Sequence, residues 1–456
     1  MSRYLVFAVA SSALFLSALS GTAVSVAFPV ITESFDTNLV VAGWILSIHQ
    51  LVATTSMPLG GKFADTYGKK FTFQLCLLLF AVGSALAAVA PNVPTLIGGR
   101  FLQGVAFGGF MPCASGIVAD EFPQSRMRAI GFIGGIMPIG QIIGPNLGGW
   151  LVEAFGWRSI FWFNIPLALI AFVGAGLLLR SGEKQAEEID LVGAGYLGGS
   201  LSALMVGLSM TGKREQFASG GWLLVPFLIA AGIMLMIFFL RREVKVQHPI
   251  IDLGILRKRP FAAANVYSFF FGAGVMSVFA FMPLYTVSVY HLSILESGFI
   301  LTPRSVGMIM GTLVSSFFLP RWGYRTPMIV GTLIVVASLL LLSTERAGAD
   351  VLGMKIGSTV WLLMLMMLSG LGIGVTGPAA NNASLELMPD RIPTIIGIRG
   401  MFSQTGGLLG ITTSTLVLHN VGDMSRGFFI VFLGLSTIML MVIPLVFLMP
   451  SGRGVR

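Results

Sequence analysis

Long apolar runs separated by short polar segments make up nearly the whole chain. About 20 apolar residues are enough to cross the hydrocarbon core of a bilayer as a helix. Fourteen runs reach about this length, and the tenth and thirteenth each contain one arginine. The runs cover residues 4–32, 37–61, 71–99, 101–119, 129–152, 159–179, 191–212, 216–240, 260–295, 297–320, 326–344, 356–385, 392–421 and 427–451. This pattern predicts an all-α integral membrane protein with fourteen transmembrane helices.

The composition agrees with a bilayer as the solvent of this chain. The 456 residues are 55% hydrophobic and 10% charged, whereas soluble proteins usually carry about 25% charged residues. A net charge of +9 can indicate a nucleic-acid partner, but here the basic residues lie in short separate segments and form no continuous patch. We therefore expect the lipid bilayer, and no nucleic acid, as a partner.

The distribution of the 28 basic residues predicts the topology. If the N-terminus is cytoplasmic, 19 of them fall in cytoplasmic segments and 6 in outer segments. The other three, Arg100, Arg304 and Arg399, fall in or beside apolar runs. Short loops rich in lysine and arginine stay on the cytoplasmic side of a membrane. The protein is therefore expected in the cell membrane (plasma or inner), multi-pass, with both termini in the cytoplasm.

A charged stretch and its partial repeat predict a duplicated chain. Residues 60–70 read GGKFADTYGKK, a polar loop expected on the cytoplasmic side between the second and third runs. Residues 316–325, SFFLPRWGYR, repeat part of this pattern between the tenth and eleventh runs. We predict an N-terminal six-helix bundle over 1–182 and a C-terminal six-helix bundle over 259–456. Residues 183–258 are expected to form a linker with an extra transmembrane hairpin and a cytoplasmic interfacial segment.

Three motifs occur in the order and at the spacing of a known family. The charged loop contains Gly61, Phe63, Ala64, Asp65, Gly68, Lys69 and Lys70. Arg100 directly precedes the fourth run, which contains Gln103 and Gly104, and the fifth run contains Gly140, Gly144, Pro145, Gly148 and Gly149. Together these motifs resemble the major facilitator superfamily, in its 14-span drug:proton antiporter branch. The resemblance implies two six-helix bundles plus an extra two-helix hairpin, and alternating-access export of hydrophobic or amphipathic small molecules.

The charged loop has two interpretations. Asp65 can accept hydrogen bonds from a helix N-terminus or a basic side chain. Lys69 and Lys70 can meet helix ends or lipid headgroups. Such contacts would make the loop a cytoplasmic gate that opens when the bundles rock. Alternatively, the charges serve only as a topology signal.

The motifs of the fourth and fifth runs also leave alternatives open. Arg100 can face a cavity, or it can anchor the outer end of its helix by snorkelling to the interface. The glycines at positions 140, 144 and 148 let another helix approach closely, and Pro145 removes a backbone hydrogen bond so that the helix can bend. Packing alone can explain this pattern, whereas the resemblance implies a seam that seals the cavity and favours export.

The main departure from the branch lies in the first run. Members typically carry an aspartate there, taken as the proton or cation site, but this chain has Ser20. A buried carboxylate is the usual proton carrier because burial raises its pKa towards physiological pH. His49 in the second run is one replacement, and Asp65 or Glu121 at the cytoplasmic mouth is another. The third alternative is transport without a coupled proton.

The embedded positive charges bear on the substrate. A cavity lined by Arg100, Arg304 or Arg399 and lacking carboxylates would favour anionic or neutral amphipathic molecules over cationic drugs. An alternative function is therefore an uncoupled transporter or flippase of anionic amphipaths such as lipids or fatty acids. The sequence shows no catalytic constellation and no metal-ligand spacing. We expect a monomeric transporter, neither an enzyme nor a cofactor-binding protein.

Overall fold

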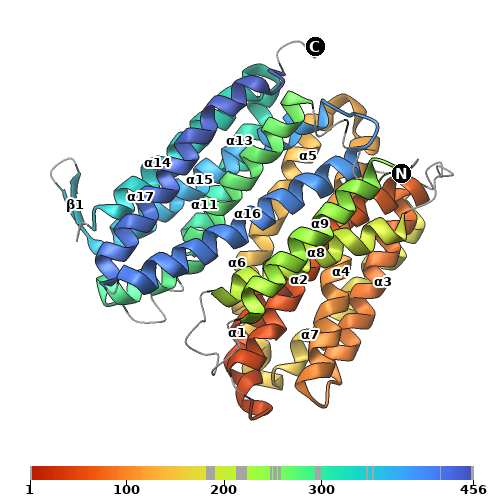
Figure 1. Ribbon diagram of the computed structural model, residues 1–456, viewed down its shortest axis with the longest axis horizontal. Coiled ribbons are helices and arrows are strands. Elements are labelled where there is room, and N and C mark those ends of the chain that lie inside the picture. The colour runs from red at the N-terminus through yellow and green to blue at the C-terminus, as the bar shows by residue number, and fades with distance from the viewer. Residues whose placement is uncertain are drawn as a thin grey trace. The chain divides into compact units, whose positions relative to one another are not determined.

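Long helices account for most of the structure (Figure 1), a computed structural model of the chain. It describes residues 3–37, 39–180, 190–211, 223–246, 249, 254, 258–292, 299–345, 348–351, 354–421 and 423–452. Most of the expected linker before the hairpin and most of the expected interfacial segment after it lie outside the described residues.

The chain up to residue 178 forms helices α1 to α7 and one short 3-10 helix. They are α1 (Arg3–Ser34), α2 (Leu39–Tyr67), α3 (Lys69–Ala88), α4 (Val93–Glu121), η1 (Pro123–Ser125), α5 (Arg126–Gly134), α6 (Ile136–Phe155) and α7 (Arg158–Leu178). The fifth apolar run is divided because the helix breaks at Gly135, between α5 and α6. Pro145, where the sequence indicates that the helix can bend, lies inside α6.

The later helices account for the other expected spans. Helices α8 (Leu191–Thr211) and α9 (Leu224–Glu243) correspond to the extra hairpin. They are followed by α11 (Arg259–Tyr290), α13 (Thr302–Trp322), α14 (Arg325–Ser343), α15 (Ser358–Leu385), α16 (Ile392–Val421), α17 (Met424–Val442) and η4 (Ile443–Leu448). Each expected span thus coincides with a helix or a helix in two pieces, and the all-α membrane fold is confirmed. Within the described chain, ten helical segments are by themselves long and apolar enough to cross a membrane.

A short β-hairpin lies between α14 and α15, where the sequence predicts only a loop. Strand β1 (Gly348–Val351) pairs antiparallel with β2 (Met354–Gly357), so that Gly348 faces Gly357 and Val351 faces Met354. The pairing satisfies backbone N–H and C=O groups within the segment itself. This hairpin therefore adds a small sheet to an otherwise helical chain.

The chain forms two compact units. The first contains Met1–Gly198, Phe238–Asp252 and Met388–Met401, and the second contains Gly199–Ile237, Leu253–Leu387 and Phe402–Arg456. The beginning of α16 therefore belongs to the first unit, although it follows the helices of the second unit in the sequence. The boundaries expected from the sequence, after residues 182 and 258, stay predictions.

Each unit has its own aromatic core. In the first unit, the ring of Phe80 on α3 packs against that of Phe110 on α4, with centroids 5.9 Å apart. In the second unit, Tyr285 of α11 packs against Phe428 and Phe432 of α17, at 4.9 and 5.0 Å. Such pairs contribute about 0.5–1.5 kcal/mol beyond the burial of their area. The first pair joins two consecutive helices, and the contacts of Tyr285 join two helices that are far apart in the sequence.

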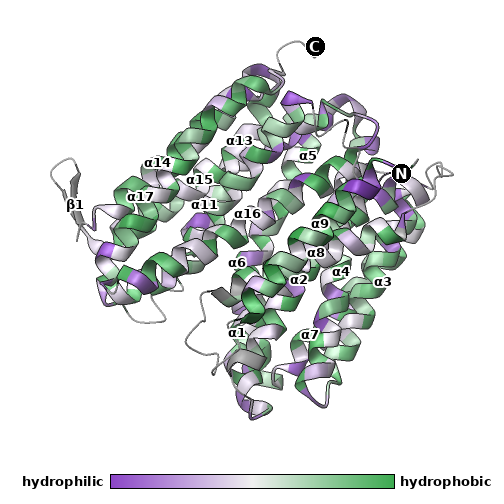
Figure 2. Ribbon diagram, viewed as in Figure 1, coloured by the Kyte–Doolittle hydropathy of each residue, from purple (hydrophilic) through white to green (hydrophobic). Residues whose placement is uncertain are grey.

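The outer faces of the helices are apolar as well. Figure 2 shows hydrophobic residues along the length of most helices and hydrophilic residues mainly near helix ends. On α3, for example, Phe71, Leu78 and Val82 are exposed. Large apolar surfaces of this kind are unfavourable in water but contact lipid in a bilayer. The exposed faces therefore agree with a membrane environment.

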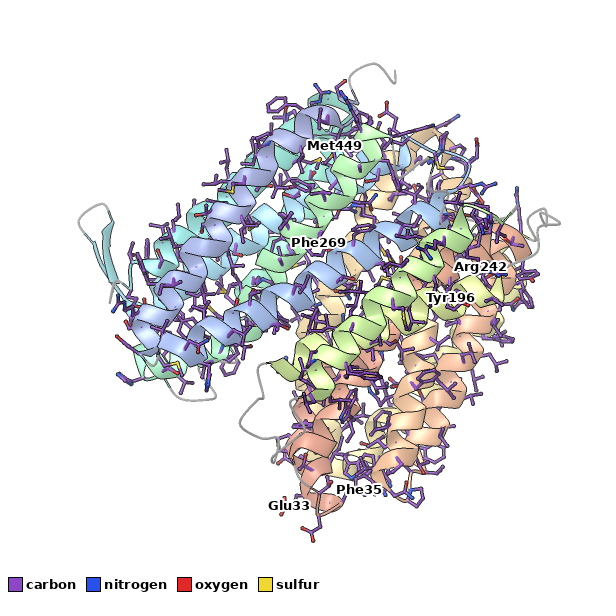
Figure 3. All side chains as sticks on the ribbon, viewed as in Figure 1. Glu33, Phe35, Tyr196, Arg242, Phe269 and Met449 are labelled. Carbon is purple, nitrogen blue, oxygen red and sulfur yellow. The ribbon has the colours of Figure 1, made fainter. Side chains whose placement is uncertain are left out.

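An ion pair joins the two helices of the hairpin formed by α8 and α9. Arg242, labelled in Figure 3, lies near the end of α9 and donates from Nε and Nη2 to the two carboxylate oxygens of Asp190, at 2.6 and 2.8 Å. Asp190 precedes α8 and also accepts the Gly193 N–H at 3.0 Å, which caps the helix. The hydrogen bonds from Arg242 hold the pKa of the Asp190 carboxyl below its usual range.

Candidate functional site

The charged motif is largely helical, which corrects the expected loop over residues 60–70. Helix α2 continues through the motif to Tyr67, and α3 begins at Lys69. The turn between them is Gly68 alone, whose φ of 95° lies in the region that glycine adopts most easily. Asp65 therefore lies in the last turn of α2. Its side chain contacts a segment that is distant in the sequence.

That segment is the beginning of α16. One carboxylate oxygen of Asp65 accepts the Thr394 backbone N–H at 3.1 Å and the Thr394 hydroxyl at 2.5 Å. Thr394 is the third residue of α16, so its N–H has no acceptor within the helix, and the N-terminal end of a helix favours a negative charge. The contact joins two residues that are 329 positions apart. Gly61 permits it, because a Cβ there would lie 2.8 Å from the Thr394 Cα.

The two lysines of the motif contact the ends of other helices in the first unit. Lys69 Nζ lies 2.5 Å from a carboxylate oxygen of Asp120 near the end of α4. Lys70 Nζ donates to the Gly176 carbonyl near the end of α7, at 2.7 Å. Positive charges stabilise helix C-termini, although pairs open to solvent contribute at most about 1 kcal/mol. Lys69 and Lys70 thus orient α3 towards α4 and α7.

Arg100 is buried in the interior of the first unit. The sequence places it near the outer end of its helix, but α4 begins at Val93, capped by Asn92, so Arg100 lies about two turns inside. Its side chain is 2% exposed. Its Nε donates to the Ile45 carbonyl of α2 at 3.1 Å, and its Nη1 donates to Gln103 at 2.8 Å. These contacts tie α4 to α2 and leave no role for snorkelling.

A polar chain continues from Arg100 across three helices. The Gln103 amide nitrogen donates to the Ser84 hydroxyl of α3 at 2.8 Å. On the other side, Gly104 brings α4 close to α2, because a Cβ there would lie 2.8 Å from the His49 carbonyl oxygen. His49 is buried and its ring lies 5.7 Å from that of Phe107. The structure therefore places His49 and the Arg100 motif in one region of the first unit.

The glycines of α6 form a close seam with α1. A Cβ at Gly140 would lie 2.8 Å from Ala18 Cβ, and one at Gly148 would lie 2.7 Å from Ala23 Cα. Between them, a Cβ at Gly144 would clash with the Thr22 hydroxyl. Three successive helical turns thus allow backbone contact. Gly149 lies off this face, with nothing nearer than 4.0 Å, and Pro145 lies within the helix.

Ser20 lies on α1 and has a partner that the sequence analysis missed. It is 1% exposed, and its hydroxyl accepts a hydrogen bond from the Asn164 amide of α7 at 2.8 Å. Asn164 is fully buried, and its amide oxygen has no hydrogen-bond partner among the described residues. The one signal in the sequence is an amide within the apolar stretch of α7. The position of the branch's aspartate is therefore occupied by a neutral polar pair.

The remaining two candidates lie in different units. Arg399 belongs to α16 within the first unit and is partly exposed. Arg304 belongs to α13 in the second unit and is buried. A cavity lined by Arg100, Arg304 or Arg399 stays a prediction.

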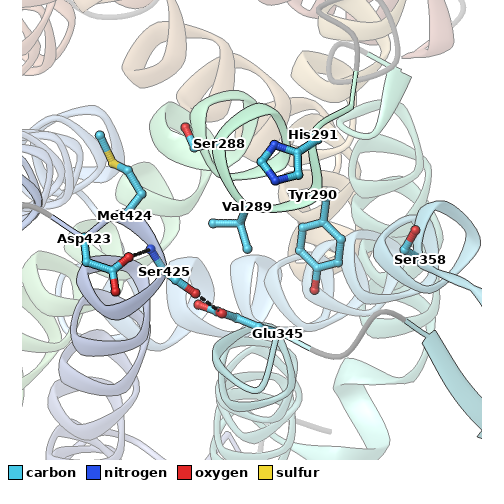
Figure 4. Close-up of a pocket in the computed structure, with 9 residues that line it drawn as sticks. All are labelled: Ser288, Val289, Tyr290, His291, Glu345, Ser358, Asp423, Met424 and Ser425. Atoms are coloured by element: carbon cyan, nitrogen blue, oxygen red, sulfur yellow. Dashed lines mark hydrogen bonds between the residues drawn. The ribbon is translucent and has the colours of Figure 1, made fainter.

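The second unit also contains a polar pocket of about 460 Å³ (Figure 4). It lies at the end of α11 and the beginning of α17, where Glu345 accepts a hydrogen bond from the Ser425 hydroxyl and Asp423 accepts the Ser425 N–H at 3.1 Å. Its lining consists of Ser288, Val289, Tyr290, His291, Glu345, Ser358, Asp423, Met424 and Ser425. None of the candidates from the sequence lies in this lining.

The long apolar helices and their exposed apolar faces define a multi-pass membrane protein. Over residues 10–411, the chain matches the sequence model described as Major Facilitator Superfamily. The chain belongs to the major facilitator superfamily and is a membrane transporter. This result confirms the family that the three motifs indicate.

Three relatives match most of this chain, and each is named as a transporter or an export protein. The chain is 30% identical over 413 residues to "Multidrug transporter protein MdtP" of Bacillus subtilis (strain 168), covering 89% of this chain and 74% of that protein. It is 31% identical over 412 residues to "Tetracenomycin C resistance and export protein" of Streptomyces glaucescens, with 89% and 74% covered. It is 27% identical over 407 residues to "Riboflavin transporter RibZ" of Clostridioides difficile (strain 630), with 88% and 84% covered.

A solved structure supports the fold. The human organic anion transporter MFSD10 (TETRAN) superposes with a TM-score of 0.72 and 17% sequence identity. The match covers 98% of this chain and all of that chain. At this identity the likeness concerns the fold alone.

Proposed function

We propose that this transporter exports hydrophobic or amphipathic small molecules across the cell membrane by alternating access, as a monomer with both termini in the cytoplasm. The names of the relatives support this cargo, since two of them denote a multidrug transporter and a tetracenomycin C resistance and export protein. The observation that carries the proposal is the contact of Asp65 with Thr394. It joins the N-terminal half of the sequence to α16 through hydrogen bonds that can break and re-form.

In this mechanism the Asp65 contact is a gate on the cytoplasmic side. A hydrogen bond to a charged group contributes about 1.5–3 kcal/mol, which is enough to favour one conformation and small enough to be overcome by substrate binding. The glycine seam between α1 and α6 would seal the path, as the resemblance implies. Lys69 and Lys70 would keep α3 in register while the gate opens.

An antiport mechanism also requires a group that binds and releases the coupled proton. Neither the Ser20 hydroxyl nor the Asn164 amide gains or loses a proton near physiological pH, so the first helix lacks the usual proton carrier. His49 is the titratable group beside the Arg100 motif. We propose His49 as the first candidate for coupling and Asp65 as the second.

A second candidate function rests on the pair of Ser20 and Asn164. A neutral polar pair at the position of the branch's aspartate favours transport that runs down the substrate's own gradient. The protein would then be an uncoupled transporter or flippase of anionic amphipaths such as lipids or fatty acids. The buried arginines are consistent with such a cargo.

Flux measurements in proteoliposomes distinguish the two functions. The purified protein is reconstituted, and the uptake of a cationic dye, a neutral drug and a fatty acid is followed with and without an imposed pH gradient. Proton-linked export predicts that the gradient drives accumulation of the dye or the drug against its concentration. The uncoupled function predicts that the fatty-acid flux is the same with and without the imposed pH gradient. No flux of any of the three above protein-free vesicles would contradict both.

A further inference from the structure

Arg304 is a buried cation of the second unit with an unusual environment. Its side chain is 4% exposed. The guanidinium carbon lies 5.0 Å from the centre of the Phe279 ring, and Nη2 donates to the Val275 carbonyl at 3.2 Å. Both partners lie on α11, so the side chain reaches from α13 across to that helix. Phe279 and Val275 together hold the guanidinium in one place.

The position of Arg304 is deep, although it is the third residue of α13. Val275 lies near the middle of α11, about 22 Å along the helix from Tyr290 at its end. On α15, a Cβ at Gly370 would lie 2.9 Å from the Arg304 Cα, and Gly370 is about 18 Å from the first residue of that helix. Two independent neighbours thus place Arg304 beside the middle of α11 and beside the middle of α15.

The charge of Arg304 lacks a counter-ion. Its Nε has no hydrogen-bond partner, and no carboxylate among the described residues lies within ion-pair distance. Arg100 in the first unit is equally buried but donates to both a carbonyl and the Gln103 side chain. Burial of a charge without a partner is costly, and the cost falls when an anion binds. Arg304 is therefore prepared for an acceptor that the described part of the chain does not supply.

The chemistry around Arg304 identifies the acceptor. A guanidinium can donate two parallel hydrogen bonds to the two oxygens of a carboxylate, and a single backbone carbonyl cannot accept both in this arrangement. The neighbouring α11 side chains Val278 and Met282 are buried in an apolar cluster, against which Val275 and Phe281 pack. We propose that Arg304 binds the carboxylate of an amphipathic substrate whose hydrocarbon body packs along α11. This inference rests on the proposed function and names the class of substrate that the second unit selects.

Three probes with one hydrocarbon body and different charges test this site. Naphthoate, naphthamide and naphthylmethylammonium are titrated into the full-length protein in detergent. The native protein should bind naphthoate most tightly. Arg304→Gln should raise the Kd for naphthoate by about ten- to a hundredfold, the loss expected for a hydrogen bond to a charged group, and should change the other two by less than about twofold. Arg321→Gln, at the exposed end of the same helix, should change none of them.

The controls separate binding from folding and from transport. Arg304→Lys keeps the charge but not the paired hydrogen bonds of the guanidinium, so it should weaken naphthoate less than Arg304→Gln does and still bind naphthoate most tightly of the three probes. This result can be measured even if Arg304→Gln unfolds in a thermal melt. Equal weakening of all three probes by both Arg304 variants, or no preference for naphthoate in the native protein, would overturn the inference. Binding in detergent does not require transport. Absence of flux in proteoliposomes would therefore contradict the proposed function alone.

Discussion

Asp65 and Ser20 carry the two residue-level conclusions about this transporter. The charged carboxylate of Asp65 lies at the N-terminus of α16, where the hydrogen bonds from Thr394 and the helix dipole both favour a negative charge. Ser20 has a neutral hydroxyl, which accepts a hydrogen bond from Asn164 within the first unit. The first contact predicts a gate, and the second predicts weak handling of protons and cations. Each conclusion can be tested by one substitution.

Replacing Asp65 by alanine should loosen the contact between α2 and α16. The lost hydrogen bonds contribute roughly 1.5–3 kcal/mol, so a cysteine at the buried position Ile395 should react with a water-soluble maleimide about ten times faster or more. Cys76 and Cys113 are buried and give a low background. Asp120→Ala is the matched control, because this carboxylate is 62% exposed. Unchanged labelling and unchanged transport in Asp65→Ala would mean that the motif is only a topology signal.

Replacing Ser20 by aspartate should increase the dependence of transport on the pH gradient. The new carboxylate would lie beside the Asn164 amide at low exposure, where burial favours a titrating acid. The measurement is cationic-dye flux in proteoliposomes across pH jumps, and Ser20→Asn serves as the neutral control of similar size. Strong pH-gradient drive in the native protein that His49→Ala abolishes would instead locate the coupling on α2.

At the scale of helices, two devices determine how elements meet. The first is close backbone packing, in which the glycines of α6 face α1 within the first unit. The second is the ion pair of Asp190 and Arg242, which holds the extra hairpin. Glycine packing depends on the absence of side-chain volume, whereas the ion pair depends on charge and therefore on pH. An added side chain therefore disrupts the glycine packing, whereas a change of pH disrupts the ion pair.

Adding one methyl group to the seam should be damaging at Gly144 and tolerated at Gly149. At Gly144 the new Cβ would meet the Thr22 hydroxyl and lie 2.8 Å from the Leu19 carbonyl oxygen, whereas at Gly149 the nearest atom is 4.0 Å away. Overpacking of this kind typically costs about 1–3 kcal/mol. Gly144→Ala should therefore lower the thermal unfolding temperature and the flux, and Gly149→Ala should change neither. Equal behaviour of the two variants would show that the seam is not tightly packed.

The helical hairpin of α8 and α9 should be less stable in acid than at neutral pH. The pKa of Asp190 is lowered from its ordinary value of 3.8 by Arg242, so the ionised carboxylate stabilises the folded protein above that ordinary value. This contribution is lost as the pH falls through the lowered value. Thermal melts should show that Asp190→Asn is less stable than the native protein at neutral pH and equal to it in strong acid. A difference that is constant over the whole range would contradict the charge pairing.

For the whole molecule, bilayer physics determines both the fold and its orientation. Every backbone polar group in the hydrocarbon core must find its partner within the protein, which favours long helices. The fourteen expected spans accordingly appear as helices, and the two compact units contain the cores that hold them. The charge asymmetry of the connecting segments then predicts which side faces the cytoplasm.

Orientation can be tested with two exposed arginines. Arg128 precedes the fifth span on the predicted cytoplasmic side, and Arg426 lies near the start of α17 on the predicted outer side. In intact cells, Arg426→Cys should react with a membrane-impermeant maleimide, and Arg128→Cys should react only after permeabilisation. The reverse pattern would invert the topology and place the Asp65 contact on the outer side.

The sequence by itself determined the number of spans, the membrane class and the family motifs. These follow from local rules, because the thickness of a bilayer sets the length of an apolar run and glycine or charge acts within a few residues. Only the tertiary structure decided that Asp65 meets Thr394, that Ser20 meets Asn164 and that Arg304 is buried with no counter-ion among the residues that the structure describes. Such pairs depend on which helices pack together and at what depth, and partners hundreds of residues apart leave no periodic signal in the chain.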